Sequence, residues 1–125
     1  MPNLKRLRAH AFSKQGGRCF YCNAPMWESS PAELSDLGST PFARALRCTA
    51  EHLQAREDGG RNTRHNIVAA CWHCNSLRHR RKVPLDPEKY RRLVQARLAR
   101  GRWHAQVVVQ LLTSANTSPT SKLAS

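Results

Sequence analysis

A short stretch in the middle of the chain combines residues that can do metal-assisted chemistry. Glu51 and His52 are adjacent, and two asparagines, Asn66 and Asn75, follow them. A carboxylate and an amide oxygen are hard ligands that suit Mg²⁺ or Mn²⁺. A histidine beside such ligands can take a proton from water, because an imidazole titrates near neutral pH. Together, these residue types could hold a divalent cation and activate a water molecule beside it.

Four of the five cysteines form two C-x-x-C pairs, Cys19 with Cys22 and Cys71 with Cys74. Two such tight turns can clamp one tetrahedral zinc ion, and four thiolates leave no open position for water or substrate. The alternative is two buried or redox-active pairs, and the spacing favours structural zinc. Cys48 is expected to be a small core residue on a strand.

Taken together, these positions resemble the HNH (ββα-metal) nuclease family, in the variant with Asn at the third position. The resemblance covers residues 19–82 and implies a β-hairpin followed by a helix around one divalent cation. It implies that His52 is the general base and that Asn66 holds the catalytic loop. It also implies that Glu51 and Asn75 bind the cation, and that the products of cleavage are a 5′-phosphate and a 3′-hydroxyl.

Two positions depart from the family pattern, and one further histidine is a candidate for the site. Glu51 stands where Asp is usual, which lengthens the ligand arm by one methylene. Ala55 stands where Pro is frequent. His79 follows Asn75 by four residues, so it falls on the same helical face. It is a candidate further ligand or phosphate contact, and the alternative is one more polar residue in a basic run.

The chain is strongly basic, with 21 Lys and Arg against 8 Asp and Glu among 125 residues and a formal net charge of +13. Such an excess favours a polyanionic partner, here DNA. The residues expected to contact nucleic acid are Arg56, Arg78, Arg80, Arg81 and Lys82. No recognition helix is evident, which predicts weak sequence preference or targeting by a protein partner, for example a packaging protein.

Periodicity and punctuation predict the elements that would position these residues. Apolar spacing predicts a helix over 3–15, closed by two glycines, and a second helix over 75–82. A third helix, over 87–100, is delimited by Asp86 as N-cap and Gly101 at its end. Strands are predicted at 46–50, leading into Glu51 and His52, and at 67–70. The segments predicted to be irregular are 27–41, with a short turn near 32–37, and 55–65, while 107–112 is predicted to be a short strand or a docked segment.

The predicted class is therefore a small α+β ββα-metal core with a zinc clamp and flanking helices. We expect an HNH endonuclease domain over 1–112 and a disordered tail over 113–125. No secretory or membrane-spanning segment is recognised, so we expect a bacterial or phage-infected cytoplasm, with a phage or prophage origin by analogy. The alternatives are a non-catalytic zinc-ribbon module that binds nucleic acid and a basic zinc protein that binds RNA or ribosomes. The presence of His52 and Asn75 favours the nuclease.

Overall fold

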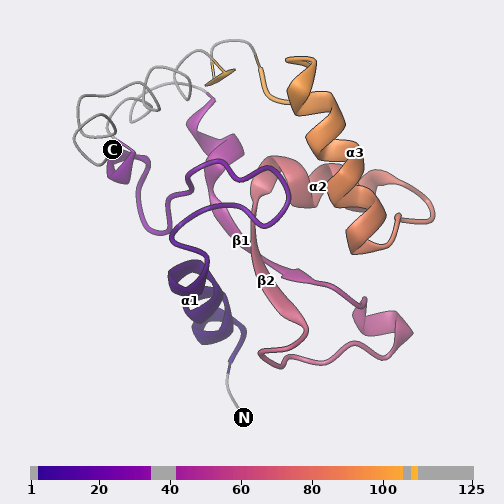
Figure 1. Cartoon of the computed structure of the whole chain (residues 1–125). Helices are drawn as coiled ribbons and strands as arrows, with labels where there is room; N and C mark the ends of the chain where they lie inside the picture. Colours follow the sequence, from indigo (N-terminus) through magenta and orange to yellow (C-terminus); the bar gives the residue numbers. More distant parts are fainter. Residues whose placement is uncertain (1–2, 35–41, 106–107, 110–125) are drawn as a thin grey trace.

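The computed structural model describes residues 3–34, 42–105 and 108–109 (Figure 1). Within these ranges the chain forms a two-stranded sheet and helices, which confirms the small α+β class. The elements, in chain order, are α1 (Leu4–Lys14), 3₁₀ turns at Pro31–Glu33 and Ala43–Leu46, β1 (Cys48–His52), a 3₁₀ turn at Arg56–Asp58, β2 (Ile67–Cys71), α2 (Trp72–Arg80) and α3 (Pro87–Ala99). No helix in this part of the chain is long and apolar enough to cross a membrane.

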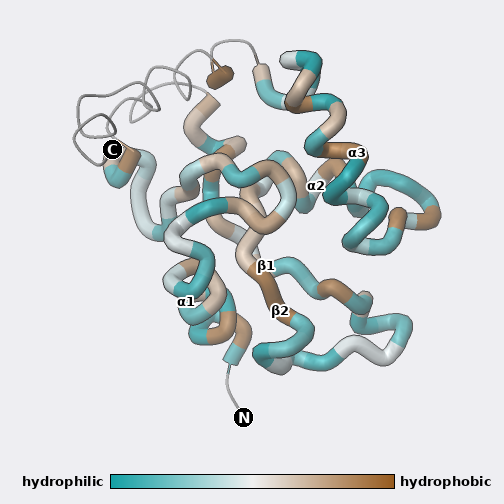
Figure 2. Tube along the Cα trace, in the orientation of Figure 1, coloured by the Kyte–Doolittle hydropathy of each residue, from teal (hydrophilic) through white to brown (hydrophobic). Residues whose placement is uncertain are grey.

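The centre of the molecule is the hairpin of β1 and β2. The strands pair antiparallel, from Cys48 opposite Cys71 to His52 opposite Ile67. Figure 2 shows apolar residues along β2, whereas the segment that joins β1 to β2 is largely hydrophilic. The strand predicted at 46–50 begins later, at Cys48, because the chain just before it forms the turn Ala43–Leu46 and buries Leu46.

α1 and α2 pack against the hairpin, and the helices begin where side chains cap them. α1 packs against both strands through buried Leu7 and Ala11. α2 begins three residues before the predicted start, because Cys71 is its N-cap and its Sγ accepts the Cys74 N–H at 3.4 Å. At α3, Asp86 caps the first turn as predicted.

The core lies between the hairpin, α3 and the first C-x-x-C turn. Tyr21, Leu46, Tyr90 and Val94 are among its fully buried side chains, and Trp103 closes it. Val108 is also buried, within the segment predicted at 107–112. Three predicted segments extend outside the described residues: positions 107 and 110–112 of that segment, positions 35–41 of the 27–41 loop, and the tail at 113–125.

Candidate active site and four-cysteine centre

The cysteines of the two C-x-x-C pairs converge in the core, as the sequence predicts. Their four Sγ atoms all lie within 4.8 Å of one another, and all four residues are buried. Cys22 Sγ and Cys71 Sγ are 3.8 Å apart. Zn–S bonds of about 2.3 Å in a tetrahedron place neighbouring sulfurs about 3.8 Å apart, whereas a disulfide needs about 2.05 Å. The four-cysteine centre therefore fits a zinc ion and not a pair of disulfides.

The thiols of the four-cysteine centre differ in acidity. Burial raises the pKa of Cys19, but hydrogen bonds from the other three cysteines outweigh it and hold that pKa well below its usual value. Hydrogen bonding to Cys19 raises the pKa of Cys71, and burial raises that of Cys74. The cluster alone thus favours a thiolate at one sulfur over its neighbours, and a divalent ion would supply the charge that allows all four to ionise.

Two residues that follow α3 in the chain complete the surroundings of the four-cysteine centre. The indole N–H of Trp103 donates to Cys74 Sγ at 3.2 Å, and His104 Nε2 lies 3.4 Å from Cys22 Sγ. Burial, helped by the nearby His73, lowers the pKa of His104 to about 4, so this ring is neutral. Sequence analysis missed both residues, because a single Trp-His pair has no metal-ligand spacing that would single it out.

Cys48 is separate from this centre. It lies on β1, is 2 % exposed, and burial raises its pKa to about 12. It therefore stays a protonated core thiol, as predicted.

Glu51 lies at the end of β1 with its carboxylate inside the protein. The residue is 2 % exposed. Its Oε2 accepts from the Tyr21 hydroxyl at 3.0 Å and from Arg78 Nη1 at 3.1 Å, while Oε1 lies 2.9 Å from His79 Nε2. Burial, reinforced by the charge of Glu51, raises the pKa of Tyr21. The hydroxyl therefore stays protonated and donates a hydrogen bond to Glu51. These partners compensate for removing a carboxylate from water.

His52 is half-buried beside Glu51 and has one ring nitrogen engaged. Its Nε2 lies 2.8 Å from Asn62 Oδ1. Because an amide oxygen can only accept, Nε2 carries the proton and the lone pair is on Nδ1. Asn62 was not singled out in the sequence, where it is one of several polar residues in a loop.

Asn66 holds the segment between β1 and β2 closed. Its Oδ1 accepts from Gln54 N at 2.8 Å, and its Nδ2 donates to the carbonyls of Gln54 and Arg61 at 3.0 Å each. Gly60 lies so close to the Gln54 carbonyl that a Cβ there would clash with it. The Asn66 side chain thus holds closed the loop that carries Asn62.

Asn75 and His79 are one turn apart on α2 and both face β1. Asn75 Nδ2 donates to Thr49 Oγ1 at 3.0 Å and to the Ala50 carbonyl at 3.2 Å. Nothing in the described ranges donates to its Oδ1. The amide is therefore anchored through its nitrogen, and its oxygen is the atom left for a ligand role.

We define the candidate cation site as Glu51 Oε1, His79 Nε2 and Asn75 Oδ1. Two adjacent ligands of an octahedral Mg²⁺, each at 2.0–2.1 Å, are about 3.0 Å apart. The 2.9 Å between Glu51 Oε1 and His79 Nε2 matches this separation. The His79 side chain is 40 % exposed, so an ion can reach the pair from solvent. The carboxylate and amide oxygens of Glu51 and Asn75 are ligand types that a hard divalent cation prefers, and His79 would add an imidazole nitrogen.

The expectation that Arg78 contacts nucleic acid is corrected by the structure. Arg78 is 5 % exposed, and its guanidinium binds Glu51 and the carbonyls of His52 and Leu85. A side chain held from three directions inside the protein cannot reach a phosphate. Arg78 instead links the Glu51 carboxylate to the backbone at His52 and Leu85.

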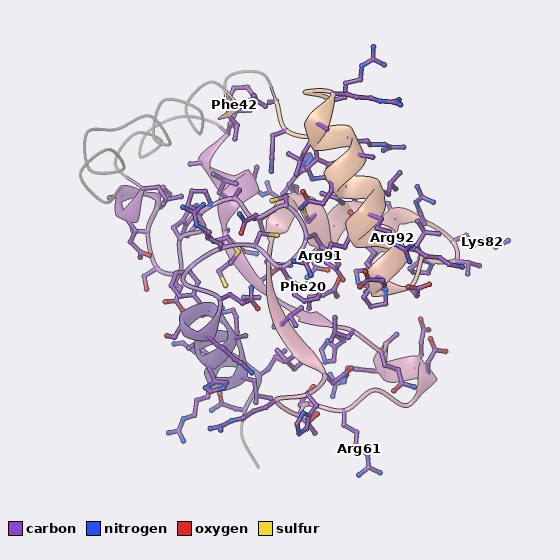
Figure 3. The ribbon with its side chains drawn as sticks, viewed as in Figure 1. Phe20, Phe42, Arg61, Lys82, Arg91 and Arg92 are labelled. Carbon is purple, nitrogen blue, oxygen red and sulfur yellow. The ribbon has the colours of Figure 1, made fainter. Side chains whose placement is uncertain are left out.

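The other predicted contacts are exposed side chains at the surface. Arg56 lies in the loop after β1, while Arg80, Arg81 and Lys82 lie at and beyond the end of α2. Figure 3 shows Lys82 pointing outward from the segment that joins α2 to α3. The structure adds a second basic surface on α3, where Arg91 lies over the Phe20 ring at 5.0 Å (Figure 3).

Comparison with known protein families agrees with this geometry. Residues 39–81 match the HNH endonuclease family. The HNH match spans β1, β2 and α2, and so includes both strands of the hairpin and every member of the candidate cation site. The resemblance seen in the sequence is confirmed for this segment, while the first C-x-x-C pair lies outside it. Searches of curated proteins and of solved structures found no match.

Proposed function

We propose that this chain is a metal-dependent HNH endonuclease that hydrolyses phosphodiester bonds in DNA. One observation carries the proposal: His52, hydrogen-bonded to Asn62, follows Glu51 at the end of β1, and Glu51 Oε1 meets His79 across the hairpin–helix junction. A base and a pair of metal ligands are the two parts that hydrolysis of a phosphodiester needs.

The residues divide the chemistry between them. His52 takes a proton from the attacking water at Nδ1, and the charge that forms on the ring is stabilised where Nε2–H donates to Asn62 Oδ1. Glu51, Asn75 and His79 would hold Mg²⁺ or Mn²⁺. When bound, such a cation neutralises charge developing on the phosphate and on the leaving 3′ oxygen. The expected products are a 5′-phosphate and a 3′-hydroxyl.

The substrate would be held by sequence-independent contacts. The net charge of +13 and the exposed side chains of Arg56, Arg80, Arg81 and Lys82 suit the phosphates of DNA. Contacts to phosphates position a duplex without reading its sequence. Selection of a cleavage site would then come from a protein partner that targets the nuclease, as in DNA packaging by a phage or prophage.

The four-cysteine centre would hold a structural Zn²⁺ and keep the hairpin in place. Five free thiols suit the reducing environment of a cytoplasm. We assign residues 1–112 to one HNH domain on this basis, because the Trp103–Cys74 contact ties the chain beyond α3 to the same centre.

A second candidate, a non-catalytic zinc-ribbon module that binds nucleic acid, is favoured by one observation. Arg78 already neutralises Glu51 in a buried ion pair, so this carboxylate has a structural partner without any cation. In such a module His52 would serve only to hold the loop through Asn62.

Plasmid cleavage distinguishes the two candidates. Wild type, His52→Ala and the control His65→Ala are compared with Mg²⁺, with Mn²⁺ and with EDTA. His65 is a suitable control because it is an exposed histidine of the same loop. We expect metal-dependent cutting by wild type and by the control, and none by His52→Ala with its zinc content intact. Plasmid binding without cutting in every metal would favour the binding module.

A further inference from the structure

Tyr21 connects the four-cysteine centre to the candidate active site. It lies inside the first C-x-x-C turn, between Cys19 and Cys22, and is fully buried. Its backbone N–H donates to Cys19 Sγ at 3.4 Å, while its hydroxyl donates to Glu51 Oε2 at 3.0 Å. One residue therefore contacts a sulfur of one centre and a carboxylate of the other.

The position of the Tyr21 ring is fixed by its neighbours. The ring packs edge-on against Tyr90 at 4.8 Å and against Phe20 at 5.2 Å. The turn that carries it is closed by the hydrogen bond from Asn23 N to the Cys19 carbonyl and is anchored on β2 by Phe20 N, which donates to the Ala69 carbonyl. The hydroxyl therefore has little freedom to move independently of the cysteines.

The two oxygens of Glu51 have different partners. Oε2 accepts from Tyr21 and from Arg78, so the protein occupies it from two sides. Oε1 faces His79 alone among the described residues. Holding Oε2 prevents the carboxylate from rotating about its last bond, which keeps Oε1 directed at the candidate cation site.

We propose that Tyr21 is a positioning residue for the cation, through which the four-cysteine centre orients Glu51. This inference rests on the proposed function, since it concerns the same cation site. It also assigns the first C-x-x-C turn, which lies outside the HNH match, a part in the chemistry. Partners that orient metal ligands typically contribute about 10–100-fold to metal affinity or activity.

Tyr21→Phe tests the proposal, and Tyr90→Phe is a matched control. Each substitution removes one buried phenol hydroxyl and keeps the ring. Tyr90 is 1 % exposed and donates to the Cys74 carbonyl at 2.6 Å, so its hydroxyl contacts the four-cysteine centre but not Glu51. Mn²⁺ binding to the zinc-loaded full chain is measured by electron paramagnetic resonance without DNA, beside zinc content and the Mn²⁺ dependence of plasmid cleavage.

We expect Tyr21→Phe to bind Mn²⁺ about 10–100-fold more weakly than wild type with one zinc retained, and Tyr90→Phe to bind it as wild type does. Unchanged Mn²⁺ binding in Tyr21→Phe, or an equal loss in both variants, would overturn the proposal. Loss of zinc or of folding in Tyr21→Phe alone would overturn it too, because the hydroxyl would then serve the fold. Failure of wild type itself to bind Mn²⁺ or to cut would instead count against the proposed function.

Discussion

Removing the Asn62 side chain should slow cleavage while leaving the fold and the zinc content intact. In Asn62→Ala, His52 Nε2–H loses the acceptor that lies 2.8 Å away. Asn62 is half-exposed and, within the described residues, its side chain is hydrogen-bonded to His52 alone. The effect should therefore fall on the orientation and charge of the imidazole rather than on stability.

The magnitude follows from what happens to this hydrogen bond during proton transfer. Before transfer it joins two neutral groups and contributes about 1 kcal/mol, and afterwards it joins a charged ring to an amide oxygen and contributes about 2 kcal/mol. The difference of about 1 kcal/mol stabilises the transition state. Freedom for the unheld ring to leave its reactive orientation adds about 0.5 kcal/mol. Together these predict a loss in rate of about tenfold.

Single-turnover cleavage of supercoiled plasmid at saturating enzyme measures this effect, because it excludes product release. DNA affinity is measured separately by fluorescence anisotropy in Ca²⁺. The matched variant is Asn62→Asp, which keeps an acceptor oxygen at the same distance and should remain within a few-fold of wild type. A wild-type rate in Asn62→Ala, or equal losses in Ala and Asp variants, would refute the assignment of Nε2 as the held nitrogen and Nδ1 as the base.

Two further predictions concern the metal centre and the DNA contacts. Cys71→Ser should lose zinc and unfold, because structural zinc contributes about 10–16 kcal/mol, as much as a typical domain's whole stability. The control is Cys48→Ser, at the position that pairs with Cys71 across the two strands. It should keep zinc and lose about 1–3 kcal/mol of folding stability, because it buries a hydroxyl. Zinc release and thermal melting measure both, and retention of zinc by Cys71→Ser would remove this residue from the centre. Lys82→Ala should reduce the slope of log K against log salt for DNA binding by about 0.9, while Lys5→Ala, the same charge change on α1, should reduce it less. Equal slopes for these two variants would mean that the end of α2 is no preferred DNA contact.

The helices and strands could be predicted because each has a local signal. Asp86 and Gly101 delimit α3 in the sequence as they do in the structure. The start of α2 was missed because its cap is Cys71, a residue that analysis of the sequence reserves for metal. A cysteine that ligates a metal and also caps a helix has no separate signature in a single sequence.

The candidate site was predictable only where chemistry and spacing coincide. His52 and Asn75 fall within a motif, whereas Tyr21 and Arg78 contribute through contacts between distant segments and Asn62 through a contact across its own loop. Arg78 shows why. Within a run of basic residues nothing in the sequence marks the one whose side chain turns inward. In the fold, Arg78 turns inward because Glu51 on β1 accepts its hydrogen bond. Long-range partners of a buried carboxylate follow from the fold and not from local pattern.

The separation of Cys22 from Cys71 has a consequence for the unfolded chain. The contact between their sulfurs joins residues 49 positions apart, and β1 with its following loop lies between them. A metal that stayed bound to both cysteines in the unfolded chain would remove about 4 kcal/mol of conformational entropy, expressed as TΔS, from the denatured ensemble. Because this quantity grows only slowly with loop length, residues inserted at the exposed Ser29 and Ser30 should change it by only a few tenths of a kcal/mol. With the proposed zinc bound, the β1–β2 hairpin lies within a closed ring whose length can vary while its closure cannot be lost.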